Sequence, residues 1–328
     1  ANVPCDETLR AQFPDPDAAL HDPRYQAGVP RDAGADWDFA DVTDHYLELL
    51  FGPDARSLRG RDPARYLDLC RATTAEVMAT VQHRWRARSN PCQGALLWFL
   101  RDLRPGPGWG VVDARGAPKA AYAALRRAWA PVALWFVDRG LDGLSLHAAN
   151  DGARAFEGTL ELELLQAGGA VVERATRAVA LRARSQAVWN VEGLLGRFAD
   201  ASYAYRFGPP GHRLVSARLD PPDGAVVPGL PCAALHLPDG PPREVEPDVG
   251  LVAIAEPAPG GYRLTVEAER LAWGVLVEAP GFRAADDFFH LAPARPHSFL
   301  LHALQPGARL AGRLRALNAH QGAAIELR

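Results

Sequence analysis

The stretch Gly94–Trp129 reads GALLWFLRDLRPGPGWGVVDARGAPKAAYAALRRAW. It opens with an unbroken apolar run, Ala95 to Leu100, which is too short for a buried helix and predicts a buried strand of the parallel kind. A loop rich in glycine and proline follows. Pro118 then stands where a first helical turn tolerates proline, and helix formers continue from Ala120 to Ala130. Strand, loop and helix together predict one βα unit.

The chain before this unit predicts a loop and then two helices. Residues 1–36 carry repeated proline, aspartate and glycine without apolar periodicity, which predicts a long loop. Asp38 or Asp41 can cap a helix over Phe39–Phe51. A second helix has Asp62 as its N-cap, and its apolar stripe keeps the helical period to Arg88.

The chain after residue 131 predicts β structure. Short alternating segments indicate about seven strands before Pro221, which is typical of an immunoglobulin-like sandwich. They lie at Leu134–Asp138, Leu144–Asn150, Thr159–Leu164, Val171–Val179, around Trp189, at Tyr203–Phe207 and at Leu214–Leu219. A linker, Pro238–Pro247, leads to a second, smaller β-sandwich. Its strands are predicted at Leu251–Glu256, Tyr262–Glu269, Val275–Glu278, Ser298–His302 and Arg313–Leu317. We therefore expect an α+β multidomain chain with domains 1–131, 132–238 and 239–328.

Composition narrows the range of partners. The 328 residues carry a net charge of −3 without a run of five or six like charges, which argues against a nucleic-acid surface. No apolar run approaches the roughly 18 residues of a membrane span. The scattered Cys5, Cys70, Cys92 and Cys232 predict free thiols, and with no signal pattern in the chain we expect a bacterial cytoplasmic location. No histidine cluster has metal-ligand spacing, and no cofactor is predicted. Lys119 is the only lysine, which we interpret as codon bias.

Several motifs carry a family resemblance. WFLRDL followed by PGWGVVDARGAPKAAYAALRR resembles the last βα unit of the catalytic barrel in family 2 glycoside hydrolases, in particular the bacterial β-mannosidases. WDFADVTDHYLELLFG upstream, and SYAYRFGPP and FFHLAP downstream, extend the resemblance over nearly the whole chain. It implies the C-terminal remnant of a (β/α)8 barrel followed by two β-sandwich domains, and retaining hydrolysis of terminal β-mannosides.

The same resemblance implies that the catalytic carboxylates lie outside this chain. Retaining glycosidases need two carboxyl groups about 5–5.5 Å apart. In the family they come from barrel strands four and seven, and the segment like Ala1–Pro4 follows a Ser-Glu-Phe-Gly motif that carries the nucleophile. We therefore predict no catalytic residue here and an inactive isolated chain. Replacement pairs would be Asp102 with Asp113, or Asp286 with Asp287, and the latter pattern favours a solvated turn.

Four substrate-binding residues are predicted, namely Trp98, Asp102, Arg104 and Trp109. Trp98 and Asp102 share a face of the predicted strand, at the end where βα barrels bind substrate. The resemblance implies that the indole stacks on a pyranose and that the carboxylate accepts sugar hydroxyls, although a tryptophan on a buried strand also suits a core. Arg104 replaces a tryptophan common in the family and can stack over a sugar or reach an acidic substituent. Trp109, at the loop tip, is a second aromatic wall or a lid.

The expected partners are a β-mannoside or related oligosaccharide and the missing N-terminal part of the same protein. Two alternatives stay open. One is a non-catalytic β-sandwich protein that binds carbohydrate or another partner, and the other is a different family 2 specificity, for a β-galactoside or β-glucosaminide. The aromatic residues Tyr203, Tyr205 and Phe207 could form a carbohydrate platform, but their strand-like alternation favours a core or an interface.

Overall fold

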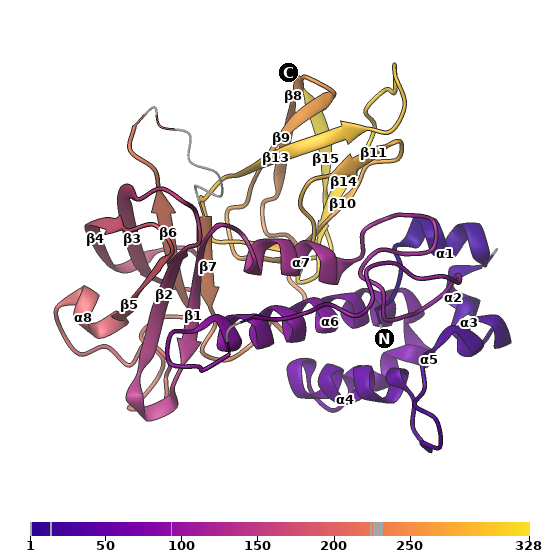
Figure 1. Cartoon of the computed structure of the whole chain (residues 1–328), viewed down its shortest axis with the longest axis horizontal. Coiled ribbons are helices and arrows are strands. Elements are labelled where there is room, and N and C mark those ends of the chain that lie inside the picture. The colour runs from indigo at the N-terminus through magenta and orange to yellow at the C-terminus, as the bar shows by residue number, and fades with distance from the viewer. Residues whose placement is uncertain (1, 14, 93, 224, 226–231) are drawn as a thin grey trace.

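A computed structural model describes the chain except residues 1, 14, 93, 224 and 226–231 (Figure 1). The architecture is mixed α+β, with helices concentrated before residue 130 and strands in sheets after it. None of the helices in the described residues is long and apolar enough to cross a membrane. All four cysteines are free, as predicted.

The helices that the structure describes include two short 3-10 turns. They are α1 (Asp6–Gln12), α2 (Pro16–Ala19), α3 (Pro23–Gly28), α4 (Phe39–Phe51), η1 (Ala55–Ser57), α5 (Leu58–Arg61), α6 (Pro63–Arg86), α7 (Ala120–Ala128), η2 (Gly140–Asp142) and α8 (Val191–Leu195).

The predicted loop over residues 1–36 is wrong, because three short helices occupy much of it. Pro16 and Pro23 stand at the first positions of α2 and α3, where a missing N–H leaves no intrahelical hydrogen bond unmade. The Asp22 side chain caps α3 by accepting from the backbone N–H of Arg24. Leu9 of α1 packs in the same core as the long helix α6. The prolines that indicated a loop therefore start helices.

The predicted helices α4 and α6 are present and begin at the predicted caps. Asp38 accepts from the backbone N–H groups of Ala40 and Asp41, and the Asp41 side chain accepts in return from the Asp38 N–H. The Asp62 side chain caps α6, which ends at Arg86 rather than at the predicted Arg88.

Replacing Asp38 with alanine is expected to lower the free energy of unfolding by about 1 kcal/mol, because the capping box satisfies N–H groups that the first helical turn leaves unpaired. Urea unfolding followed by circular dichroism would measure this loss. Asp36→Ala is the control, since Asp36 is an exposed carboxylate just before the cap. Equal losses in the two variants would contradict a capping role.

The predicted parallel strand Ala95–Leu100 is wrong. The segment is irregular, and the Leu96 and Trp98 side chains are 101% and 76% exposed. Its strand-type pairing in the described residues is limited to isolated bridges nearby, such as that between Arg101 and Val112. A parallel strand needs neighbours on its edges, and no strand of the described chain lies beside this one. The helix after the loop, α7, packs along α6 (Figure 1). Pro118 precedes its N-cap residue, Lys119.

The strands between residues 132 and 236 form two sheets around one core. They are β1 (Val132–Asp138), β2 (Leu144–Asn150), β3 (Phe156–Leu165), β4 (Val171–Leu181), β5 (Ser185–Asn190), β6 (Leu214–Asp220) and β7 (Cys232–His236). The sheet orders are β1-β2-β5 and β4-β3-β6-β7. Leu146 from the first sheet and Leu162 from the second belong to one buried cluster. The strand predicted at Tyr203–Phe207 is absent, and β7 was not predicted.

The remaining strands form one eight-stranded sheet, in the order β11-β13-β9-β8-β15-β14-β10-β12. They are β8 (Val252–Ala258), β9 (Gly261–Glu267), β10 (Ala272–Glu278), β11 (Phe282–Ala284), β12 (Phe289–Leu291), β13 (His297–Ala303), β14 (Arg313–Ala316) and β15 (Ala323–Leu327). Phe282 and Phe289, from opposite ends of this order, share one buried cluster. The sheet therefore folds over its own core. The short strands β11 and β12 and the last strand, β15, were not predicted.

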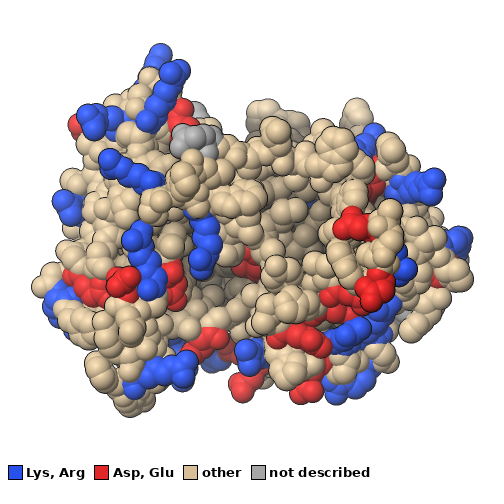
Figure 2. Space-filling view, turned by 60° about the horizontal axis from the view of Figure 1, so that its bottom comes forward, with Lys and Arg blue, Asp and Glu red and all other residues tan. Residues whose placement is uncertain are grey.

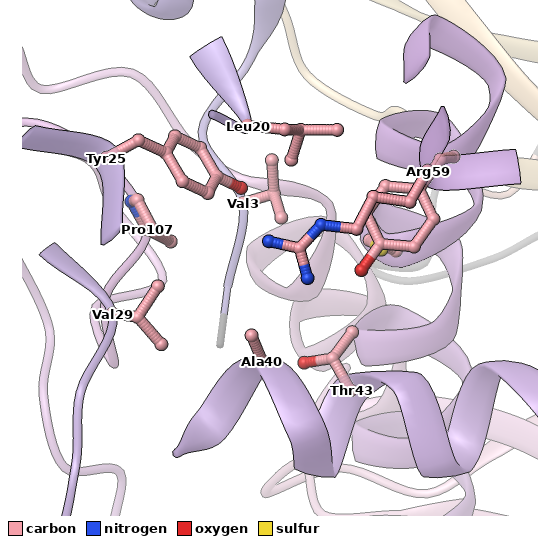
Figure 3. Close-up of a pocket in the computed structure, with 10 residues that line it drawn as sticks. Val3, Leu20, Tyr25, Val29, Ala40, Thr43, Arg59 and Pro107 are labelled. Carbon is pink, nitrogen blue, oxygen red and sulfur yellow. The ribbon is translucent and has the colours of Figure 1, made fainter. Parts of the chain in front are cut away.

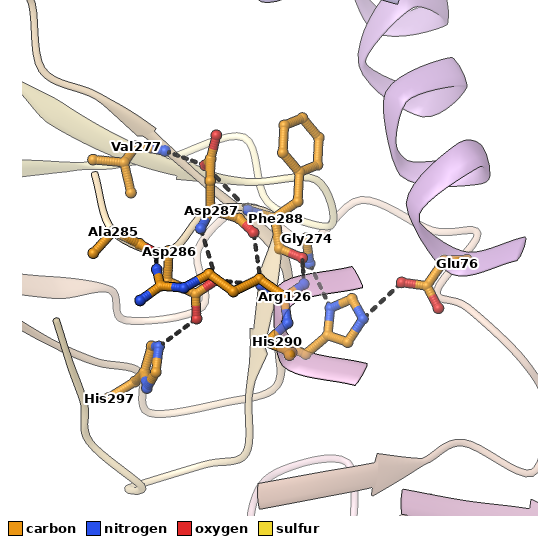
Figure 4. Close-up of polar contacts among 11 residues, drawn as sticks. Glu76, Arg126, Gly274, Val277, Ala285, Asp286, Asp287, Phe288, His290 and His297 are labelled. Carbon is orange, nitrogen blue, oxygen red and sulfur yellow. Dashed lines mark hydrogen bonds and ion pairs between the residues drawn. The ribbon is translucent and has the colours of Figure 1, made fainter. Parts of the chain in front are cut away.

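Polar contacts join the helices to this sheet (Figure 4). The His290 ring donates to Glu76 of α6 at 2.9 Å and accepts from the backbone N–H of Gly274 at 2.9 Å. Arg127 of α7 forms an ion pair with Asp286. Asp286 also accepts from His297 at 2.8 Å. The predicted solvated turn at Asp286–Asp287 is therefore wrong.

Candidate functional site

A row of aromatic rings crosses the loops at the helical end of the molecule. Trp98, Phe99, Trp109, Phe39 and Trp37 follow one another with ring centroids 5.2, 5.7, 5.4 and 5.7 Å apart. The contacts are tilted or edge-on, the geometry that aromatic pairs prefer. The row starts at the exposed Trp98 and joins its loop to the first residue of α4. Its exposed end offers a flat apolar surface with an indole N–H at the edge.

Asp102 lies beneath this loop as a buried carboxylate. One of its oxygens accepts from the backbone N–H of Gly110 at 2.7 Å, and the other forms an ion pair with the buried Lys119. Burial lowers the pKa of Lys119, and the Asp102 charge opposes that shift. Both oxygens of Asp102 are thus bound by groups of the protein itself.

The segment at Asn2 is held against the same loop. Asn2 exchanges two backbone hydrogen bonds with Gly108, at 2.8 and 3.2 Å, and its side chain donates to the Trp109 carbonyl at 3.2 Å. The Lys119 ammonium donates to the Asn2 carbonyl at 2.8 Å. One buried lysine therefore ties the start of the chain to Asp102 and the loop. We name this unit the Lys119 clamp: Lys119, Asp102, Asn2, Gly108 and Gly110.

Two glycines allow the loop to approach Asp102 this closely. A Cβ at Gly108 would lie 2.3 Å from an Asp102 carboxylate oxygen, and one at Gly110 would lie 2.6 Å from the Asp102 backbone nitrogen. Such distances are far below van der Waals contact. The glycine-rich PGPGWG sequence is therefore required by the packing over the carboxylate.

The second carboxylate of the suggested replacement pair is also occupied. Asp113 is buried and accepts from the Thr8 hydroxyl at 2.5 Å, and from the backbone N–H groups of Arg115 and Ala117 at 2.9 Å each. A nucleophile or general acid needs an oxygen that can reach the substrate. Neither Asp102 nor Asp113 offers one in this arrangement.

A small pocket borders the clamp (Figure 3). Val3 and Pro107, each next to a clamp residue in sequence, lie along it, and the guanidinium of Arg59 points into it between Tyr25 and Thr43. Burial raises the pKa of Tyr25, which keeps its hydroxyl protonated. The pocket combines one cation with mainly apolar walls.

The four predicted substrate residues thus occupy different positions on one loop. Trp98 and Trp109 are connected through Phe99, Asp102 lies beneath the loop, and Arg104 is exposed. Sequence reasoning missed Lys119 and the aromatic partners of Trp109. The available signal was that Lys119 is the single lysine among 36 basic residues. No group of three or more metal-ligating side chains occurs within the described residues. On the face in Figure 2, acidic and basic side chains are interspersed around an area that carries neither.

Comparison with known proteins identifies the architecture. No family model matches the chain. A β-D-mannosidase of Dictyoglomus thermophilum matches 96% of this chain with a TM-score of 0.75 at 18% identity. This chain resembles a family 2 β-mannosidase. The exo-β-D-glucosaminidase CsxA of Amycolatopsis orientalis matches 99% with a TM-score of 0.67 at 15% identity. In sequence, β-mannosidase B of Aspergillus niger is 38% identical over 76 residues.

The chain matches only part of the length of each of these proteins. The chain spans 36% of the D. thermophilum enzyme and 41% of CsxA, and the 76 matched residues are 9% of the A. niger protein. The similarity therefore covers one part of larger glycosidases.

Proposed function

We propose that this chain forms the C-terminal part of a retaining glycosidase of the β-mannosidase kind. The observation that supports this most strongly is the match of 96% of the chain to a β-D-mannosidase fold, together with an aromatic row that ends at the exposed Trp98. The proposed divisions are 1–131 as the end of a (β/α)8 barrel, 132–238 as an immunoglobulin-like sandwich and 239–328 as a second sandwich.

In this proposal the loop between residues 98 and 110 borders the sugar subsite. Trp98 stacks on the apolar face of a pyranose, Trp109 forms a second wall, and Arg104 supplies hydrogen-bond donors at the rim. Asp102 supports the site from beneath, because its oxygens are bound by Gly110 and Lys119. The exposed apolar side chains on either side of Trp98 suit a surface that the remainder of the barrel covers.

The two catalytic carboxylates are proposed to come from outside this chain. The bonds that occupy Asp102 and Asp113 support this. Asp286 and Asp287 are likewise engaged, with Arg127 and with the backbone N–H groups of Val277 and Phe288. The 328-residue chain is then inactive by itself and works within a longer enzyme.

The test begins with the reading frame upstream of Ala1. We expect a Ser-Glu-Phe-Gly motif directly before Ala1 and an Asn-Glu pair further upstream. The longer product is expected to hydrolyse p-nitrophenyl β-mannoside, whereas the 328-residue chain releases no nitrophenol. A parallel assay with p-nitrophenyl β-D-glucosamine separates the two specificities. Turnover by the 328-residue chain, or a longer product without activity on either substrate, would contradict the proposal.

Within the longer product, Trp98→Ala is expected to lower kcat/KM about thirtyfold, as for the loss of a central aromatic contact of ~2 kcal/mol. Trp85→Ala is the matched control, since Trp85 is an exposed tryptophan on the distant half of α6. Equal effects of the two substitutions would remove Trp98 from the subsite.

A further inference from the structure

Three aromatic side chains are exposed together on the loop that follows α8. Phe198, Tyr205 and Phe207 are 59%, 40% and 78% exposed. The ring centroids of Phe198 and Tyr205 are 5.6 Å apart, as are those of Tyr205 and Phe207, and the latter two rings are within 23° of parallel. We call these three residues the aromatic patch. Sequence periodicity favoured a core or interface for Tyr205 and Phe207, and the observed exposure contradicts a core.

The loop holds the patch in a fixed shape. The Asp200 carboxylate accepts from the backbone N–H groups of Ala204, Tyr205 and Arg206 at 2.8, 2.9 and 3.2 Å. The Tyr205 hydroxyl donates to the Leu141 carbonyl at 2.9 Å. Arg206 has a φ of 55°, a left-handed conformation that costs free energy for a residue other than glycine. This conformation persists because the surrounding hydrogen bonds enforce it, and it leaves the rings in solvent. The aromatic patch is therefore preorganised for binding.

A free cation accompanies the rings. Arg206 lies between Tyr205 and Phe207 in sequence and is exposed, and its guanidinium forms no hydrogen bond or ion pair with any described residue. The neighbouring Arg197, by contrast, is paired with Glu173. A guanidinium carries five N–H donors and no acceptor. Beside the rings, of which Phe198 lies edge-on to Tyr205, it adds hydrogen-bond donors to an apolar surface.

The size of the patch selects between two kinds of partner. At ~200 Å² per aromatic side chain, the exposed fractions give about 350 Å² of contact surface, whereas a stable protein interface needs ~800 Å² on each partner. An area of about 350 Å² is in the range of functional surface patches on monomers. It suits one or two sugar rings, whose C–H faces are apolar and whose edges carry hydroxyls for Arg206.

We propose that the aromatic patch is a non-catalytic glycan-binding site. It lies apart from the candidate substrate loop: the patch follows α8, at the opposite side of Figure 1 from the N-terminus, where Gly108 pairs with Asn2. The three rings contact the apolar faces of one or two pyranose units, with Phe198 edge-on to Tyr205, and Arg206 donates to the sugar hydroxyls. In an exo-acting glycosidase such a site would hold the body of a polymer near the enzyme. The choice of mannan as first probe rests on the proposed function, but the binding site does not require catalysis.

The test uses affinity electrophoresis of the 328-residue chain in gels that contain galactomannan, with chitosan and cellulose oligosaccharides examined by isothermal titration calorimetry. We expect retardation or measurable heat with at least one glycan. Phe207→Ala is expected to weaken binding about tenfold, as loss of an aromatic contact of ~1.4 kcal/mol would, because Phe207 is the most exposed ring of the patch. Phe198→Ala and Arg206→Asn, which tolerates the left-handed backbone, are expected to weaken it as well. Tyr122→Ala, at an equally exposed tyrosine on α7, is the control and should bind like the wild type.

The outcomes separate this site from the catalytic proposal. Absence of binding to every glycan by the folded chain would overturn the inference. Binding that Trp98→Ala abolishes and Phe207→Ala leaves unchanged would also overturn it, because the glycan would then occupy the candidate substrate loop. Self-association that Phe207→Ala disrupts, measured by sedimentation without glycan, would assign the patch to a protein contact instead. Binding lost only in the patch variants supports the inference even if the longer enzyme proves inactive.

Discussion

Replacing Lys119 with methionine is expected to lower the free energy of unfolding by about 3–5 kcal/mol, the cost of leaving a buried carboxylate without its partner. Methionine fills a similar volume, so the loss isolates the ammonium rather than a cavity. One Asp102 oxygen would lose its charged partner, and the Asn2 carbonyl would keep only the weaker hydrogen bond from the Gly108 N–H. The measurement is urea unfolding of the 328-residue chain. Arg104→Met, which removes an exposed cation from the same loop, should cost less than about 0.5 kcal/mol.

A double substitution makes this prediction sharper. Asp102→Asn combined with Lys119→Met removes both charges and keeps an oxygen that can accept from the Gly110 N–H. We expect the pair to be clearly less destabilised than the sum of the single variants, because the unpaired charge is gone. Lys119→Arg should not restore stability, since the guanidinium is larger and planar where the clamp uses a compact ammonium. If the double variant lost as much free energy of unfolding as the two single variants added together, the two charges would not stabilise one another.

The sequence predicted the elements whose signals are local. Asp38 and Asp62 start α4 and α6 at the predicted residues because an N-cap acts within three residues of itself. The helices α1, α2 and α3 were missed because each is at most seven residues long, too short to display a helical period. The prolines that start α2 and α3 were taken for loop markers.

Other errors concern elements whose structure depends on distant neighbours. The apolar run around Trp98 has the composition of a buried strand, but a strand exists only beside another strand, and sequence composition cannot supply that neighbour. Tyr205 and Phe207 alternate like strand residues, yet the Asp200 side chain accepts from the backbone N–H groups of Tyr205 and Arg206 and turns the segment into a loop.

The candidate site was predictable only in part. The loop with Trp98 and Trp109 could be recognised because its motif is contiguous. The contact between Lys119 and Asn2 spans 117 residues of sequence, so no local pattern reveals it. The one available sign, a single lysine among 36 basic residues, was interpreted as codon bias. The structure gives that lysine a definite role, because a compact ammonium fits between Asp102 and the Asn2 carbonyl where both are buried.

The second large prediction concerns pH and Asp287, at the interface of α7 with the eight-stranded sheet (Figure 4). Burial raises the pKa of Asp287 to about 7, from 3.8 for an ordinary aspartate. Between these two pH values the folded chain binds a proton that the unfolded chain has released. Stability therefore falls as pH rises from about 4 to about 7 and is constant above that range as far as Asp287 is concerned. At ~1.4 kcal/mol per pKa unit, the change from 3.8 to about 7 amounts to roughly 4 kcal/mol.

Asp287→Asn is expected to remove this loss. One Asp287 oxygen accepts from the backbone N–H groups of both Val277 and Phe288, at 3.0 and 3.1 Å, and the asparagine oxygen can accept both. The variant should match the wild type near pH 4 and exceed it by roughly 4 kcal/mol at pH 8, measured by urea unfolding at each pH.

The neighbouring charges do not reverse the predicted fall in stability with rising pH. Arg127 favours the charged form of Asp287, but less than burial opposes it, and the Asp286 charge acts in the same direction as burial. The pKa of Asp286 itself is lowered to about 2, so its own contribution is lost only as pH falls from about 4 toward 2. The pH ranges in which Asp286 and Asp287 change the stability therefore do not overlap above pH 4. Asp239→Asn, at an exposed carboxylate paired with Arg213, is the control and should leave the pH profile unchanged. If Asp287→Asn and wild type keep parallel profiles between pH 4 and 8, Asp287 is ionised in the folded chain and burial does not govern it.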